Sequence, residues 1–221
     1  MKRTFICLAN SKKYGDRCVA GIELKLNENG THTIVRENGK VKWIRPVSER
    51  EFGQIDSRMV NYISLTDIAE FEETETCPEG YQSENVKFII HTIRKVKSII
   101  PSFLSQILPK LADNETTTIF GNTNRSLTLE EVRNLTFSLL LIKVENPQIY
   151  FRNYEEITKP RMTFEFHKHE YDFPLTDIDF LEYYKNDNTL LDGISEIYVT
   201  VSLSKEFEEN VYKLIAGVLI P

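Results

Sequence analysis

The segment from residue 10 to residue 17 combines groups that contact nucleic acids. Cations, an aromatic ring and small polar side chains lie within eight positions: Asn10, Ser11, Lys12, Lys13, Tyr14 and Arg17. Lysine and arginine bind backbone phosphates, and aromatic rings stack on bases, often from loops between barrel strands. The segment therefore predicts a loop in which Lys12, Lys13 and Arg17 meet phosphate and Tyr14 stacks on a base.

A second group of candidate residues surrounds the single tryptophan of the chain. Trp43 and Arg45 lie two residues apart on a predicted strand, so their side chains share the face opposite Ile44. On an open face they would form a joint surface, with Trp43 stacking and Arg45 on phosphate. On a covered face Trp43 would be buried and Arg45 would tie the neighbouring loop down, and the pattern leaves both readings open. Gln82 and Asn85 add amides that would contact base edges or hold their own loop.

Catalytic and metal-binding patterns are weak in comparison. The sequence contains no GxGxxG, Walker A or GxSxG pattern. His167 and His169 would share one face of a strand, but zinc needs further ligands, so we expect an exposed hairpin end there. Cys18 follows Arg17, yet no motif supplies the base that a nucleophilic thiol requires. We predict no catalytic residues, no metal and no cofactor, and hence a protein that is not an enzyme.

Composition excludes several classes of protein. The chain has 221 residues, 41% of them hydrophobic, and a net charge of −6, which argues against disorder and against coating nucleic acid through global charge. Residues 1–65 hold twelve Lys or Arg against seven Asp or Glu, whereas residues 67–84 hold seven acids and no Lys or Arg. The three cysteines form no CxxC pair and no apolar run spans a membrane, so we expect a cytoplasmic protein.

Alternating and helical patterns divide the chain into two β-rich parts. Strands are predicted at residues 3–10, 19–26, 31–36, 40–47 and 62–75, with a tight hairpin turn at Asn38-Gly39. Apolar spacings of three and four predict helices within residues 86–112, the second beginning at Pro101, and Thr128 with Glu131 predicts a capped helix start. Strands return at residues 137–144, 148–153, 161–167, 170–175 and 196–203, and one apolar face predicts a C-terminal helix over residues 205–217.

These elements predict a β-rich α+β fold of two small OB-like barrels linked by a helical segment, with a C-terminal helix. The predicted domains are a first barrel at residues 1–90, a helical or irregular bridge at 91–135, and a second barrel with its terminal helix at 136–221.

Several of these segments together resemble the dual OB-containing domain family of prokaryotes. The segments are Cys7–Gly21, Trp43–Ser48, Tyr81–Asn85, Ser138–Ile142, Tyr171–Asp177, Ser202-Leu203 and Tyr212–Ala216. The resemblance spans essentially the whole chain. It implies two OB-type barrels and a nucleic-acid or nucleotide ligand, in some members within defence against mobile elements.

Two functions follow as hypotheses. The first is a non-enzymatic module that binds single-stranded nucleic acid or a nucleotide-like ligand, as a sensor or specificity subunit of a prokaryotic defence or mobile-element system. The alternative is an interaction subunit that docks a co-encoded protein through the acidic surface of residues 67–84. Neither hypothesis involves a membrane.

Overall fold

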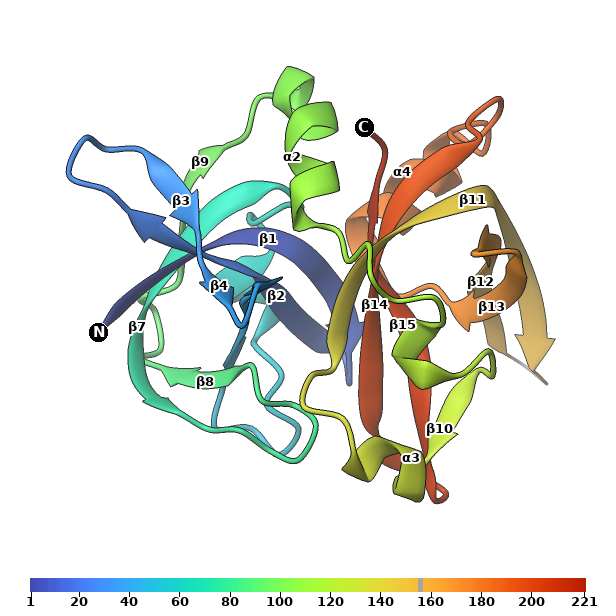
Figure 1. Cartoon of the computed structure of the whole chain (residues 1–221), viewed down its shortest axis with the longest axis horizontal. Helices are drawn as coiled ribbons and strands as arrows, with labels where there is room; N and C mark the ends of the chain where they lie inside the picture. The colour runs from blue at the N-terminus through green and yellow to red at the C-terminus, as the bar shows by residue number, and fades with distance from the viewer. Residues whose placement is uncertain (155–156) are drawn as a thin grey trace.

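Two β-sheets and a few short helices make up the protein in a computed structural model, which describes residues 1–154 and 157–221 (Figure 1). The first sheet contains β1 (Lys2–Lys13), β2 (Asp16–Leu26), β3 (His32–Ile34), β6 (Trp43–Val47), β7 (Asp67–Thr76), β8 (Asn85–Phe88) and β9 (Arg94–Ser98). The second contains β10 (Ser126–Thr128), β11 (Leu139–Tyr154), β12 (Ile157–Phe166), β13 (His169–Pro174), β14 (Glu196–Phe207) and β15 (Asn210–Leu219). The segments that connect these strands contain a two-stranded ribbon of β4 (Arg36–Glu37) and β5 (Lys40–Val41). They also contain the helices α1 (Ser57–Val60), α2 (Leu104–Leu111), α3 (Leu129–Arg133) and α4 (Ile178–Asn186), and the 3₁₀ turns Pro101–Phe103 and Ile119–Gly121.

The first sheet closes into a barrel. Its strands pair in the order β1-β2-β6-β8-β7, and β7 pairs back to β1. Only the β6–β8 step within this ring is parallel. Numbered along the chain, the strand order is 1-2-3-5-4-1, with α1 between the third and fourth strands, which is the Greek-key arrangement of an OB barrel.

The second sheet follows the same order. Strand β11 pairs with β12 and with β14, β12 pairs with β13, and β14 pairs with β15. The parallel step between β13 and β15 is reduced to one bridge, Leu175 to Ile215. Helix α4 again lies between the third and fourth strands. The β-rich fold of two OB-like barrels is therefore confirmed, and the two halves repeat a topology without repeating a sequence.

The two barrels pack tightly against each other through β1. Apolar side chains of both halves form one cluster there, which includes Leu8, Leu108, Leu141 and Leu219. The Thr200 hydroxyl donates to the Leu8 carbonyl at 2.6 Å. Helix α2 covers the seam, as Figure 1 shows. This packing decides which faces of the first barrel reach solvent.

Two helix predictions are wrong. Residues 205–217 form the β14–β15 hairpin, whose turn places Glu208 and Glu209 at φ 49° and 60°. Glutamate gives no signal for such a left-handed turn, so the hairpin resembled one amphipathic helix. Between residues 86 and 100 the chain forms β8 and β9, because its β-branched Ile and Val side chains suit a strand.

Local signals in the connecting segments are confirmed. A 3₁₀ turn with proline at its start begins at Pro101 and leads into α2. Thr128 and Glu131 form the reciprocal capping box of α3. Asn38 and Gly39 make the β4–β5 turn with φ 51° and 82°. The predicted bridge of residues 91–135 also contributes β9 to the first sheet and β10 to the second, and the domain boundaries stay a prediction.

Candidate nucleic-acid interface

A cavity of about 210 Å³ lies where the β1–β2 hairpin meets the second barrel. Several of the predicted residues line it: Ser11, Lys12, Lys13, Tyr14, Arg45 and Gln82. The second barrel adds Ser202, Ser204 and Lys205 from β14. We call this hollow the basic cavity.

The hairpin that forms one wall is longer than the sequence suggested. Strand pairing continues to Lys13 and Asp16, so the expected loop is a two-residue turn of Tyr14 and Gly15 with φ 48° and 87°. Alternation along β1 places Ser11 and Lys13 on one face. The Tyr14 ring stacks on Phe52 with centroids 4.1 Å apart and is still 64% exposed. Tyr14 is therefore an aromatic surface held at the rim of the cavity.

The charge of the basic cavity is one-sided. Lys12, Lys13 and Lys205 line it together with Arg45, whose charge is paired with Glu84, and no carboxylate of the described residues lines it. Lys205 pairs with Glu79 outside the lining, whereas Lys13 forms no ion pair within residues 1–154 and 157–221. Burial lowers the pKa of Lys13, and the charges of Arg45 and Lys205 lower it further. The arrangement favours an anion between the lysines.

Arg45 belongs to a buried network rather than to a surface. Its side chain is 2% exposed and bonds Glu84 Oε1 at 2.9 Å and Ser138 Oγ at 2.8 Å. It also donates to Asn85 Oδ1 at 3.3 Å, and the Asn85 amide donates to Gln82 Oε1 at 3.3 Å. The expected contacts of Arg45 with phosphate, and of Gln82 and Asn85 with base edges, do not fit this burial. These side chains hold the wall between the barrels.

Asn10 and Arg17 hold the other side of the hairpin. The Asn10 amide is buried and donates to the Ile63 carbonyl at 2.6 Å. Arg17 donates to Asn10 Oδ1 and to Asp179 Oδ1 of α4, each at 3.3 Å. Both residues are therefore taken up by contacts within the protein, and neither lines the basic cavity.

Trp43 and Arg45 do not form a joint surface. The indole is half-buried against the cluster between the barrels and lines a different cavity, of about 510 Å³. The second barrel covers this face of β6 at Arg45, which is buried and bonds Ser138 there. The sequence left both readings of Trp43 open, and packing selects a partly covered position.

Sequence reasoning missed the contribution of β14 to the basic cavity. Lys205 is about 190 positions away from Lys12 and Lys13 in the chain, and nothing around it signals a ligand. Only the docking of the second barrel brings it to the hairpin.

Most carboxylates of the acidic stretch, residues 67–84, are ion-paired within the chain. Of its seven carboxylates, Asp67, Glu70, Glu73, Glu75, Glu79 and Glu84 each form an ion pair.

In the described part of the chain no group of three His, Cys, Asp or Glu side chains converges on a metal position. His167 and Lys168 form the β12–β13 turn, as expected. No helix in the described ranges has the length and apolar character needed to cross a membrane.

A comparison with protein families decides the identity. The model of the dual OB-containing domain matches residues 3–218. The chain belongs to the dual OB-containing domain family. The prokaryotic source expected from the resemblance does not follow from this match. No curated protein matches the chain.

Solved structures resemble this dual OB-containing protein only loosely. A murine DNA-binding protein bound to double-stranded DNA has a TM-score of 0.33 and 4% identity, and the match covers 98% of each chain. A structure on the abrogation of activation of pro-inflammatory cytokines has a TM-score of 0.30 and 8% identity, over 98% of this chain and 93% of the other. Structural similarity this weak carries no argument about the function of this dual OB-containing protein.

Proposed function

We propose that this protein is a binding module for single-stranded nucleic acid, not an enzyme, and that the basic cavity holds part of the phosphate backbone. The observation that carries the proposal is the cavity itself, because both barrels supply its lysines and none of the described residues that line it is a carboxylate. Ser11, Ser202 and Ser204 add hydroxyl donors beside the lysines.

The size of the cavity limits what enters it. About 210 Å³ is below the range of roughly 300–1,000 Å³ typical of small-molecule pockets. A phosphate with its sugar fits such a volume, and the bases then remain outside. Tyr14, backed by Phe52, offers its exposed ring to one of them.

The alternative of protein docking through residues 67–84 has less support. Six of the seven carboxylates in that stretch are already ion-paired within the chain, which leaves Glu72 as its one acid without an ion pair in the described ranges. The narrower role of a sensor or specificity subunit in a defence system rests on the family resemblance alone.

Salt dependence of binding tests the proposal. Each phosphate neutralised on a single strand contributes roughly −0.7 to the slope of log K against log salt, so Lys12, Lys13 and Lys205 predict about −2. Fluorescence anisotropy with a labelled oligothymidylate at several salt concentrations measures the slope. Lys13→Ala should weaken binding and bring the slope nearer to zero by about 0.7.

Lys25→Ala is the matched control, because Lys25 is an exposed lysine at the far end of β2, outside the cavity. It should bind like the parent protein. Absence of binding at low salt, or equal effects of the two substitutions, would overturn the proposal and favour a protein partner.

A further inference from the structure

A hollow of about 610 Å³ lies on the first barrel, at the opposite end of β1 from the basic cavity. The first residues of β1, the end of β2 and His32 of β3 line it on one side. Val96 and Lys97 of β9 line it on the other. We call this hollow the β9 trough.

Cations outnumber carboxylates among the described residues that line the β9 trough. The cations are Lys2, Arg3, Lys25 and Lys97, and the carboxylates are Glu23 and Glu70. The excess of positive charge favours an anionic ligand.

Both carboxylates are already paired within the chain. Glu23 bonds Arg3, and Glu70 bonds Lys2 at 3.0 Å and Arg94 at 2.6 Å. Lys25 and Lys97 form no ion pair within residues 1–154 and 157–221. Their two charges are therefore available to a ligand.

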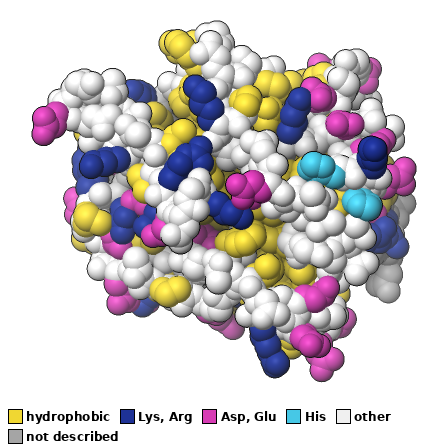
Figure 2. Space-filling model, viewed as in Figure 1, with side chains coloured by type: hydrophobic (Ala, Val, Ile, Leu, Met, Phe, Trp, Pro, Cys, Tyr) yellow, Lys and Arg dark blue, Asp and Glu magenta, His cyan; other side chains and the backbone are white. Residues whose placement is uncertain are grey.

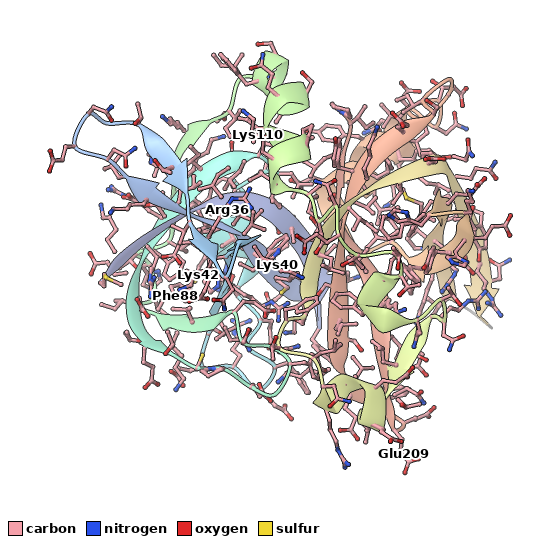
Figure 3. The ribbon with its side chains drawn as sticks, viewed as in Figure 1. Arg36, Lys40, Lys42, Phe88, Lys110 and Glu209 are labelled. Atoms are coloured by element: carbon pink, nitrogen blue, oxygen red, sulfur yellow. The ribbon has the colours of Figure 1, made fainter. Side chains whose placement is uncertain are left out.

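The neighbouring cavity beside Trp43 lacks this excess. Figure 3 labels its cations, Arg36, Lys40, Lys42 and Lys110, and four carboxylates line the same cavity. Because its charges balance, that cavity gives no preference for an anionic ligand, whereas the β9 trough does.

Aliphatic side chains form the apolar part of the β9 trough. Leu24, Leu26, Val35 and Val96 line it, and Leu26 and Val96 are 60% and 45% exposed. None of the described residues in the lining is a phenylalanine, tyrosine or tryptophan. Single-stranded nucleic acid is held by aromatic rings as well as by cations, so this lining suits a polypeptide better. Figure 2 shows dark-blue and yellow side chains beside one another over the first barrel, on the left of the view.

Both walls of the trough are edge strands. Among the described strands β3 pairs with β2 alone, and β9 pairs with β7 alone. Burial and the charge of Lys97 on β9 both lower the pKa of His32 on β3, which indicates that the two walls lie near each other. A free strand edge offers N–H and C=O groups to an extended chain. A segment that enters the trough therefore meets hydrogen-bonding backbone as well as cations.

The charges on β9 restrict which chain can pair with it. All five residues of β9 are exposed. Arg94 and Lys95 are held by carboxylates of β7, whereas Lys97 is not. Cations on an edge strand repel a second basic strand, so β9 of another copy is a poor partner. The same charges attract carboxylates on an incoming strand.

We propose that the β9 trough docks an acidic segment of a protein partner. The segment lies extended along β9, with aliphatic side chains against Leu26 and Val96 and carboxylates at Lys25 and Lys97. This interaction is separate from the binding of nucleic acid in the basic cavity and does not depend on it.

Fluorescence anisotropy with a designed peptide tests the proposal. The probe is a labelled peptide in which glutamate and valine alternate, so that its extended form has carboxylates on one face and aliphatic groups on the other. The full-length protein should bind it saturably. The same peptide with glutamine in place of glutamate should bind roughly tenfold more weakly, because it forms neither ion pair.

Lys97→Ala removes an exposed side chain from the trough and is the main variant. It should weaken binding of the acidic peptide about three- to fivefold, which is the upper range for an exposed ion pair. Lys185→Ala on α4 is the matched control, because Lys185 is also exposed, has no ion pair in the described ranges and lies outside the trough. It should bind like the parent protein.

Hydrogen–deuterium exchange shows whether the peptide pairs with the strand edge. The amides of residues 94–98 should exchange more slowly when the acidic peptide is bound. Unchanged exchange there, equal binding of the two peptides, or equal effects of Lys97→Ala and Lys185→Ala would overturn the proposal.

Oligothymidylate separates this surface from the basic cavity. Lys97→Ala should leave oligothymidylate binding unchanged, and Lys13→Ala should leave peptide binding unchanged. Weaker oligothymidylate binding by Lys97→Ala would overturn the proposal, because the trough would then belong to a nucleic-acid surface. Either site can therefore fail without the other.

Discussion

Replacing Arg45 by methionine tests whether the Arg45 side chain is buried in an ion pair or exposed on the surface. Methionine keeps much of the side-chain length and removes the charge. In the structure Arg45 binds Glu84 at 2.9 Å and Ser138 at 2.8 Å, and both charged side chains are almost fully buried. Removing one partner of a buried ion pair costs about 3–5 kcal/mol, because the other charge stays buried without compensation. Arg45→Met should therefore lower the free energy of unfolding by about that amount.

Urea unfolding followed by circular dichroism measures this loss. The double variant Arg45→Met, Glu84→Gln is the control, because it removes both charges and should recover most of the stability. Unchanged denaturant slopes would show that both variants unfold from the same compact state. A loss below about 1 kcal/mol in the single variant, typical of exposed ion pairs, would refute the buried network. Arg45 would then lie on the surface, which is one of the two positions that the sequence left open.

Three further predictions rest on other parts of the chain. Burial and neighbouring cations lower the pKa of Lys13. As pH rises, Lys13 should therefore lose its charge at a lower pH than a surface lysine does, and oligonucleotide affinity should fall with that charge. In anisotropy titrations Lys13→Arg should not show this pH dependence, because arginine keeps its charge. Burial raises the pKa of Asp177 to about 7, whereas the pKa of an aspartate in the unfolded chain is about 3.9. The protonated form of Asp177 therefore stabilises the fold fully below about pH 4, and this stability is lost as pH rises through 7. Urea melts at pH 5 and pH 8 should show this decline in the parent and not in Asp177→Asn. Gly217→Ala would place a Cβ 2.2 Å from the Leu8 carbonyl oxygen. Thermal melts should therefore show that the free energy of unfolding falls by about 1–3 kcal/mol or more. An unchanged melting temperature would contradict this contact between the barrels.

Local chemistry determined the turns and caps of this protein. Asn38-Gly39, Pro101 and the Thr128–Glu131 pair all act where the sequence indicates, since each depends on a few neighbouring residues. The β-rich class and the two-barrel organisation follow from alternation along the strands. The C-terminal hairpin does not, because its turn relies on Glu208 and Glu209 in a conformation that the strand pairing imposes on them.

The candidate site divides in the same way. Lys12, Lys13 and Tyr14 stand out in the sequence because charge and aromatic character are local properties, and the structure places them at one cavity. Arg45 is buried where it bonds Ser138, which is 93 residues away in the chain. Lys205 from β14 completes the lining of the basic cavity. Neither contact exists until the second barrel packs on β1 and β6. Which cations meet solvent and which meet a buried carboxylate is therefore a property of that interface, since burial is set by long-range packing and not by residue type.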